Sequence, residues 1–140
     1  MTDVRKFDVK ALESYIGLVS KDYHYDVTVD DVQEFSNAVA HPNDLLPVSP
    51  VYFTKLRDGE FEILEKMGIS LADLLHGEQE YEYFSDIKIG VSIVCHSRLK
   101  NMITKKNGEL IILEVETPFH VKDAELPICK SLTTFIVRNK

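Results

Sequence analysis

The stretch HGEQEYEYFSDIKIGVSIVCHSRLKNMITKKNGELIILEVET, residues 76–117, decides the fold of this chain. From Gln79 onward, aromatic and acidic residues alternate, and this period of two predicts a β-strand. Gly90 interrupts the alternation. Beyond it one long strand is predicted over residues 91–104, because four apolar residues share one parity: Ile93, Cys95, Leu99 and Ile103.

The rest of the second half predicts a hairpin and two further strands. Lys106-Asn107-Gly108 is the hairpin turn, since Asn-Gly accepts the positive φ that tight hairpins need. A turn at Asp123–Glu125 leads to a last strand over Ile128–Val137. The strand between these turns has apolar residues at alternate positions, namely Ile111, Leu113, Val115 and Phe119. We therefore expect a meander of about four antiparallel strands.

The first part of the chain is predicted to be mainly helix and loop. A short helix is expected over Asp8–Leu18, and an extended segment over Lys21–Thr28. Thr28 then caps a helix over Val29–Ala40, because its hydroxyl can accept a bond from a free N–H of the first turn. The segment HPNDLLPVSP, residues 41–50, contains three prolines and predicts an irregular loop.

Two short helical segments are predicted between this loop and the first strand of the meander. Arg57–Gly59 indicates a turn, and helical spacing from Phe61 to Gly68 then predicts one or two helical turns. Another is expected over Ser70–Leu75, where Asp73 completes a capping box with Ser70. The motif His-Gly-Glu-Gln after it is interpreted as a corner between helix and strand, with Gly77 as the C-cap.

These elements indicate an α+β protein in which a strongly curved antiparallel sheet wraps around a helix. A length of 140 residues with 44% hydrophobic content suits one domain, so residues 1–140 are assigned to a single domain. A sheet of this kind has exposed edges, and pairing with a second subunit would cover them. A dimer is therefore expected.

Composition narrows the classes of partner. A formal net charge of −7 argues against nucleic acid, because phosphate needs a basic footprint. The chain has no long apolar run and its N-terminal segment is charged, so we expect no membrane span and a cytoplasmic location. An anionic small ligand is still consistent with the sequence, because basic residues cluster in one stretch, although a solvated strand face is the favoured interpretation. These basic residues are Lys88, Arg98, Lys100, Lys105 and Lys106.

Cysteine and histidine spacing predicts neither a disulfide nor a metal site. Cys95 and Cys129 lie in apolar segments and are interpreted as buried, reduced thiols. His24, His96 and His120 have no companions at ligand spacing, so no metal is expected. Tyr81 and Tyr83 are interpreted as aromatic residues of the sheet rather than as a stacking platform.

The order and spacing of several motifs resemble the N-terminal, FAS1-like dehydratase domain of the MaoC family, which adopts the hot-dog fold. The segment YDVTVDDVQEFSNAVAHPN, residues 25–43, is also similar to the first helix and loop of that family. The motifs are His76–Gln79, Gly90, Asn107-Gly108, Glu114–Thr117 and Val137-Arg138. The resemblance implies a single hot-dog domain of lyase type that acts on acyl thioesters without a cofactor.

The chain departs from the family pattern where the catalytic residues are expected. Active hydratases of this type carry an Asp and, a few residues later, a His in the loop after the first helix. Here His41 occupies the Asp position, and the His position falls near Leu46. Val91 and Ala124 also replace residues that are usually Asp and Gly. The resemblance therefore implies that the usual Asp/His dyad has been lost.

Three functions are consistent with this resemblance. The first is a subunit of an (R)-specific enoyl-thioester hydratase or 3-hydroxyacyl-thioester dehydratase, one that binds the acyl chain while another hot-dog subunit supplies the catalytic residues. Its partners would be an acyl-CoA or acyl-carrier-protein thioester and a homo- or heterodimeric hot-dog subunit. The alternatives are an acyl-CoA or lipid binding module of a larger complex, and a hot-dog thioesterase in which Glu78 or Asp44 activates water.

Seven residues are assigned to the site on this basis. His41 and Asp44 are the candidates for a displaced catalytic pair, although a polar loop histidine is the favoured interpretation of His41. Glu78 and Gln79 are adjacent in a strand, so their side chains point to opposite faces, and a buried Gln79 bonded to backbone is favoured. Substrate binding is assigned to His76, Glu78, Gln79, Tyr52 and Phe53.

Overall fold

The computed structural model describes residues 5–38 and 56–140. This part of the chain begins with the short helix α1, the edge strand β1 and the helix α2. The central helix α3 and a 3₁₀ turn, η2, precede the five strands of the C-terminal half. The elements are α1 (Val9–Glu13), β1 (Tyr23–Asp26), α2 (Val29–Ala38), α3 (Asp58–Lys66), η2 (Leu71–Asp73), β2 (Leu74–Tyr83), β3 (Ser92–Cys95), β4 (Arg98–Lys105), β5 (Leu110–Val121) and β6 (Cys129–Arg138).

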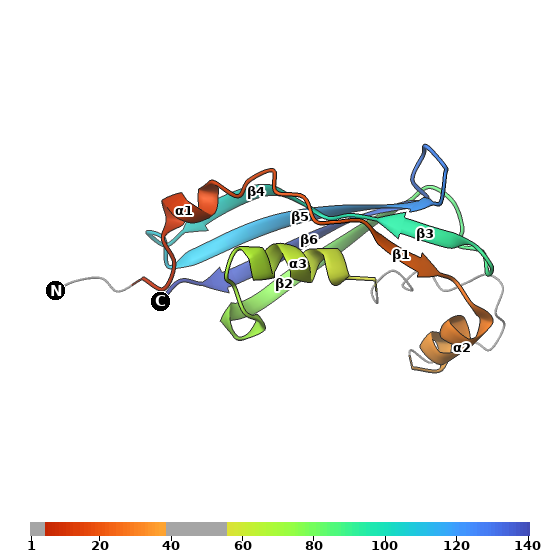
Figure 1. Cartoon of the computed structure of the whole chain (residues 1–140). Helices are drawn as coiled ribbons and strands as arrows, with labels where there is room; N and C mark the ends of the chain where they lie inside the picture. Colours follow the sequence, from red (N-terminus) through yellow and green to blue (C-terminus); the bar gives the residue numbers. More distant parts are fainter. Residues whose placement is uncertain (1–4, 39–55) are drawn as a thin grey trace.

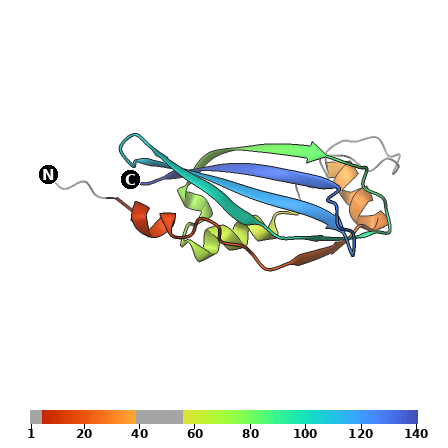
Figure 2. The ribbon, with the colours of Figure 1, turned by 90° about the horizontal axis from the view of Figure 1, so that it is seen from above.

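The strands form one antiparallel sheet in the order β1-β3-β5-β6-β2, with β4 paired to β5 beyond β3. The sheet curves around α3, which lies along its inner face (Figures 1 and 2). Two tyrosines of β1 hold the helix from the side, because Tyr25 donates to Asp58 at 2.6 Å and Tyr23 to Glu62 at 2.8 Å. Burial, together with the bond to Glu62, raises the pKa of Tyr23 to about 12. The predicted α+β fold with a curved sheet around a helix is confirmed.

Alternate residues of β5 and β6 fill the inner face of the sheet. Ile111, Leu113 and Val115 are completely buried and pack against Ile63 and Leu64 of α3. A second apolar cluster surrounds Phe119 at the other end of the sheet and includes both cysteines. Cys95 and Cys129 are free thiols, as predicted, and burial raises the pKa of each to about 12.

The start of α3 differs from the prediction. Arg57–Gly59 was expected to form a turn, but α3 begins at Asp58, so the prediction is wrong. Gly59 serves close packing instead, since a Cβ there would lie 2.5 Å from the Oγ of Ser97 and 3.0 Å from that of Ser20. The helix can approach the sheet this closely only because this residue has no side chain.

The motif His76–Gln79 lies inside β2 and not at a corner. The capping box is present, with the Ser70 amide donating to Asp73 Oδ2 at 3.1 Å, but the turn it caps covers only Leu71–Asp73. Gly77 is therefore no helix cap. Its missing side chain makes room for the neighbouring strand, because a Cβ at this position would lie 2.5 Å from the carbonyl oxygen of Thr134.

The long strand predicted over residues 91–104 is divided into β3 and β4. A bulge between Leu99 and Asn101 then adds one residue and reverses the parity of the remaining residues of β4. As a result Met102 is buried, whereas Ile103, which was expected to face the core, is 40% exposed. Parity arguments are valid only as far as the next bulge.

The predicted meander is wrong, because β2 pairs with β6, the last strand, and not with the strand that follows it along the chain. The helix expected over Asp8–Leu18 is also shorter, since α1 ends at Glu13.

The predicted helix cap at Thr28 and the hairpin turn agree with the structure. Thr28 Oγ1 accepts from the Asp31 amide at 3.1 Å at the start of α2. Asn107 and Gly108 have φ values of 56° and 86° in the hairpin turn between β4 and β5. The predicted loop over residues 41–50 lies outside the described residues. Among the helices that are described, none combines the length and apolar character needed to cross a bilayer.

Gly59→Ala is expected to destabilise the protein, although this exchange in a helix ordinarily stabilises by about 0.5–1 kcal/mol. The added methyl group meets buried Ser97, so the free energy of unfolding in urea should fall by about 1–3 kcal/mol. In a Ser97→Ala background the cost should shrink, because the nearest atom is gone. A gain in stability from Gly59→Ala would contradict this packing.

Asp73→Asn is expected to lower stability at neutral pH by about 0.5–2 kcal/mol, the usual value of such a cap. Lys6, which donates to the carboxylate, and Ser70 lower the pKa of Asp73. A depressed pKa stabilises the folded state above the unfolded pKa, and this contribution disappears as pH falls through the folded pKa. The difference in urea unfolding between the two proteins should therefore shrink steadily as pH falls below about 4. A constant difference down to strong acid would contradict this role.

Candidate functional site

A band of polar side chains crosses the inner face of the sheet beneath the start of α3. It separates the two apolar clusters described above, since Val115 and Phe135 belong to one and Phe119 and Cys129 to the other. Its members are buried and occupy positions whose parity is otherwise apolar: Ser97, Thr117, Ser131 and Thr133. Ser97 and Thr117 share a hydrogen bond of 2.6 Å between their hydroxyls.

Glu60 brings a carboxylate into this band from the first turn of α3. Its side chain is 2% exposed and accepts from Arg57 Nε at 2.6 Å and from the Thr133 hydroxyl. The guanidinium of Arg57 also lies over two aromatic rings, 5.3 Å from the centroid of Phe61 and 5.7 Å from that of Phe135. The buried charge of Glu60 is thereby both paired and hydrogen-bonded, which is the condition for keeping it in a core.

Gln79 extends this network to β2. Its Nε2 donates to Thr133 Oγ1 at 3.3 Å, so Gln79, Thr133, Glu60 and Arg57 form a continuous chain of polar contacts. The sequence favoured a buried Gln79 bonded to the backbone. The structure shows instead a half-buried side chain that is bonded to a hydroxyl group. The hydroxyl of Thr133 can accept from Gln79 while donating to Glu60.

Tyr81 lies two residues further along β2, opposite Ser131. Its ring stacks on that of Tyr83 with 5.8 Å between centroids, as expected of sheet aromatics. The Tyr81 hydroxyl is buried and makes no hydrogen bond with any described residue. Burial, together with the negative charge of Glu60, raises the pKa of this phenol, which therefore stays protonated as a donor.

A cavity of about 260 Å³ opens beside Gln79 at the edge formed by β2. Apolar walls and a few convergent polar groups are the usual composition of a small-molecule site. Here Arg57 and Gln79 carry N–H donors, Glu78 carries a carboxylate, and the hydroxyl hydrogen of Thr133 is donated to Glu60. The lining residues are Arg57, Leu74, Leu75, Gly77, Glu78, Gln79, Thr133 and Phe135.

The structure brings two of the seven assigned residues to this cavity. Gln79 forms part of its polar wall, while Glu78, at the opposite parity of β2, is exposed at the rim. The backbone of His76 belongs to the same strand, and its side chain is not described. The other assigned residues lie outside the described part of the chain: His41, Asp44, Tyr52 and Phe53.

Sequence reasoning missed the residues that build the polar band. Glu60 occupies a position on the buried face of α3, one turn before Ile63 and Leu64. In the same way Ser131 and Thr133 stand at the inward parity of β6. A polar residue in an apolar periodic position was the signal available for all three. Within residues 5–38 and 56–140, no group of three His, Cys, Asp or Glu side chains is arranged to hold a metal ion.

Comparison with known proteins places this geometry in a family. The model for the family described as "FAS1-like, dehydratase domain region" matches residues 44–126, more than half of the chain. A probable enoyl-CoA hydratase 2 from Dictyostelium discoideum is 37% identical over 65 residues. That alignment covers 46% of this chain but only 21% of the relative, so the chain corresponds to a small part of the longer protein.

Solved structures agree on the fold. The chain superposes on the HadBC 3R-hydroxyacyl-ACP dehydratase complex from Mycobacterium tuberculosis with a TM-score of 0.70 and 14% identity, covering 87% of this chain and 96% of that one. A MaoC-like dehydratase from Rhodospirillum rubrum gives a TM-score of 0.62 and 13% identity, with 89% and 93% covered. The resemblance stated from the motifs is therefore confirmed. The chain belongs to the FAS1-like dehydratase domain family and has the hot-dog fold of the MaoC-like dehydratases.

Proposed function

We propose that this chain is the acyl-thioester-binding subunit of an (R)-specific enoyl-thioester hydratase or 3-hydroxyacyl-thioester dehydratase. In this proposal a second hot-dog subunit supplies the catalytic acid and base. The observation that carries the proposal is the cavity beside Gln79, where hydrogen-bond donors meet apolar walls at a sheet edge. Glu60, a buried carboxylate bonded to two of the lining residues, is already engaged by Arg57 and Thr133.

The polar wall suits the oxygen of a thioester carbonyl. Removal of a proton from the α-carbon moves negative charge onto this oxygen, and donors placed in advance stabilise that charge. Gln79 and Arg57 present N–H groups at the cavity, and the bonds to Thr133 and Glu60 hold both side chains in place. Leu74 and Phe135 offer apolar contact to the acyl chain. In this proposal the general acid and base come from the second subunit.

The edge strand β2 provides a place for the second subunit. It has ten residues and, among the residues that the structure describes, pairs with β6 alone. The opposite edge is shorter and partly covered, because residues 17–20 bond along the start of β4, with the Gly17 amide donating to Leu99 O at 2.8 Å and the Ser20 amide to Ser97 O at 2.8 Å. Pairing through β2 would bring residues of the second subunit to the cavity.

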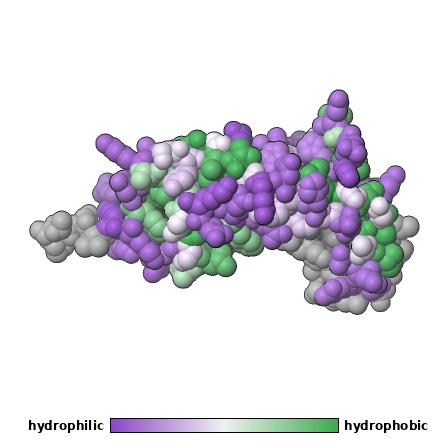
Figure 3. Space-filling model, viewed as in Figure 1, coloured by the Kyte–Doolittle hydropathy of each residue, from purple (hydrophilic) through white to green (hydrophobic). Residues whose placement is uncertain are grey.

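Exposed apolar side chains near β2 support a contact on this face. Leu71 in the turn before β2 is 65% exposed, and Phe61 on α3 is 40% exposed. The two line a groove of about 370 Å³ with Leu64, Gly68 and Ile69. In Figure 3 the outward side of α3 is mainly hydrophilic, and a hydrophobic patch lies below it, where the η2 turn is found. Such a patch beside an open strand is typical of a protein–protein contact.

The purified chain alone is expected to hydrate crotonyl-CoA only weakly. Its complex with the hot-dog partner from the native host is expected to hydrate this substrate efficiently. Loss of the enoyl absorbance under both conditions measures this directly. Efficient hydration by the chain alone would overturn the division of roles. Tight acyl-CoA binding with no hot-dog partner in the purified material would favour a binding module instead. Hydrolysis of saturated acyl-CoA that Glu78→Gln abolishes would favour a thioesterase.

Gln79→Leu is expected to lower kcat/KM of the assembled complex by at least about tenfold, because one donor to the thioester oxygen is lost while side-chain volume is nearly kept. Glu80→Gln is the matched control, since Glu80 is exposed at the opposite parity of β2. Its activity should equal that of the unchanged protein. Unchanged activity of Gln79→Leu, with both variants folded by circular dichroism, would remove Gln79 from the site.

A further inference from the structure

The outward face of the sheet, on the side away from α3, carries a row of isoleucines. Ile103, Ile112 and Ile136 lie opposite one another on the neighbouring strands β4, β5 and β6. Ile103 is 40% exposed, and the other two are half-buried. An antiparallel sheet that covers a core on one side ordinarily places polar residues at its outward positions. Three adjoining isoleucines therefore form an apolar patch of the kind that a second protein surface covers.

Positive charge lies on one side of this isoleucine row. Toward the hairpin, the next outward positions on the same three strands hold Lys105, Leu110 and Arg138, which are again opposite one another. Lys105 and Arg138 are exposed, and neither forms an ion pair with any residue that the structure describes. In a chain with a formal net charge of −7, such uncompensated cations attract an acidic surface.

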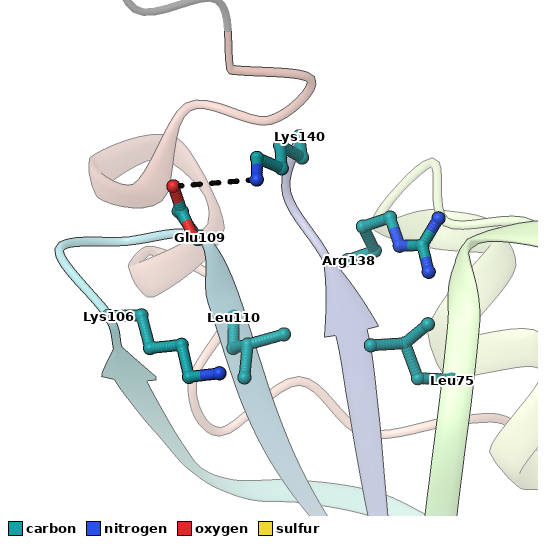
Figure 4. Close-up of a pocket in the computed structure, with 6 residues that line it drawn as sticks. All are labelled: Leu75, Lys106, Glu109, Leu110, Arg138 and Lys140. Carbon is teal, nitrogen blue, oxygen red and sulfur yellow. Dashed lines mark ion pairs between the residues drawn. The ribbon is translucent and has the colours of Figure 1, made fainter.

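A hollow of about 490 Å³ continues the positive side toward the end of the sheet (Figure 4). Figure 4 shows Leu110 of β5 and Leu75 of β2 pointing toward each other, with Lys106 beside Leu110 and Arg138 above Leu75. Leu75, at the edge of the sheet, is 47% exposed. The hollow thus adds apolar and cationic surface to the same side of the isoleucine row. Its lining residues are Leu75, Lys106, Glu109, Leu110, Arg138 and Lys140, of which Lys140 and Glu109 form an ion pair of 3.8 Å.

Negative charge lies on the other side of the row. There the next outward position of β5 is Glu114, which lies opposite Thr134 of β6, and Thr134 lies opposite Glu78 of β2. Neither glutamate has an ion-pair partner within the described ranges. One row further, Glu116 is compensated by three cations that lie 4.0, 3.8 and 3.6 Å from its carboxylate: Arg98, Lys100 and Lys130. The uncompensated acidic charge is therefore next to the isoleucines.

This order of charges is self-complementary. A two-fold axis along the isoleucine row, in the plane of contact, turns a second copy over, so that the positive side of each copy faces the negative side of the other. Ile112 of the two copies then meets at the axis. Arg138 of each copy faces Thr134 of the other, between Glu114 and Glu78 of that copy. Opposite charges placed in this way fix the register and orientation of an interface.

We propose that the outward face binds a second copy of this chain, back to back, through the isoleucine row and the charged rows on either side. The contact lies on a different surface from the open edge of β2, so it goes beyond the proposed function and does not depend on it. An overlap of four strands and about eight residues covers roughly 500 Å² of each copy, which is small for a stable interface. The association is therefore expected to depend on concentration in the micromolar range.

The first test compares the mass of the full chain with that of the variant Ile112→Asp by sedimentation equilibrium, from micromolar to submillimolar concentration. The unchanged chain should reach twice the mass of the variant, because the substitution places an unpaired carboxylate at the two-fold axis. The same ratio holds if the chain also pairs through β2. Circular dichroism checks that the variant is folded.

The second test exchanges charges to examine the orientation. Arg138→Glu and Glu114→Arg should each weaken the association by at least about tenfold, since like charges then face each other across the contact. The double variant Arg138→Glu/Glu114→Arg should recover most of it, because each exchanged residue meets an exchanged residue of the other copy. Lys122→Glu makes the same change of charge at an exposed lysine just beyond the end of β5, and this control should associate like the unchanged chain.

Either measurement can overturn the proposal independently of catalysis. Equal masses for the unchanged chain and Ile112→Asp at every concentration would mean that no second copy binds this face. A double variant that associates no better than the two single variants would exclude the two-fold arrangement. An association that Ile112→Asp abolishes and the double exchange restores supports the contact, even if no hydratase activity is found with a second hot-dog subunit.

Discussion

The position of α3 on the sheet depends on a buried carboxylate in the first turn of the helix. Glu60 is held between Arg57 and Thr133, one residue after a glycine that lets the helix approach Ser97 closely. Burying a carboxylate costs free energy unless its partners are in place, so this contact specifies where the helix lies along the sheet. The cavity beside Gln79 depends on this placement of the helix, because Arg57 and Gln79, at the two ends of the polar network, both line the cavity.

The apolar periodicity of the second half predicted most of the sheet, because inward residues of β5 and β6 alternate without interruption in their apolar parts. The prediction was wrong where backbone geometry departs from a regular period. A bulge reversed the parity after Leu99, and Gly59 and Gly77 were interpreted as turn and cap although both allow close contacts between elements. Such contacts join residues far apart in sequence, and no local pattern contains them.

The site was predictable only in part, for a related reason. The family motif at His76–Gln79 lies in the strand that borders the candidate cavity, and Gln79 lines that cavity. Arg57 and Thr133 were missed because they were assigned only to a turn and a strand, and Glu60 because it lies between the predicted turn and the predicted helical segment. Their polarity at inward positions becomes informative only when the three elements are placed together. The residues assigned before Leu56 stay predictions.

The unequal edges of the sheet have a consequence for how far association can proceed. On one side, β1 has only four residues and the segment 17–20 bonds along the start of β4, while β2 on the other side has ten residues and, among the described residues, pairs only with β6. Association through the long edge of β2 would leave the shorter and partly bonded edge, which is a poorer template for further addition. This asymmetry disfavours growth into fibres.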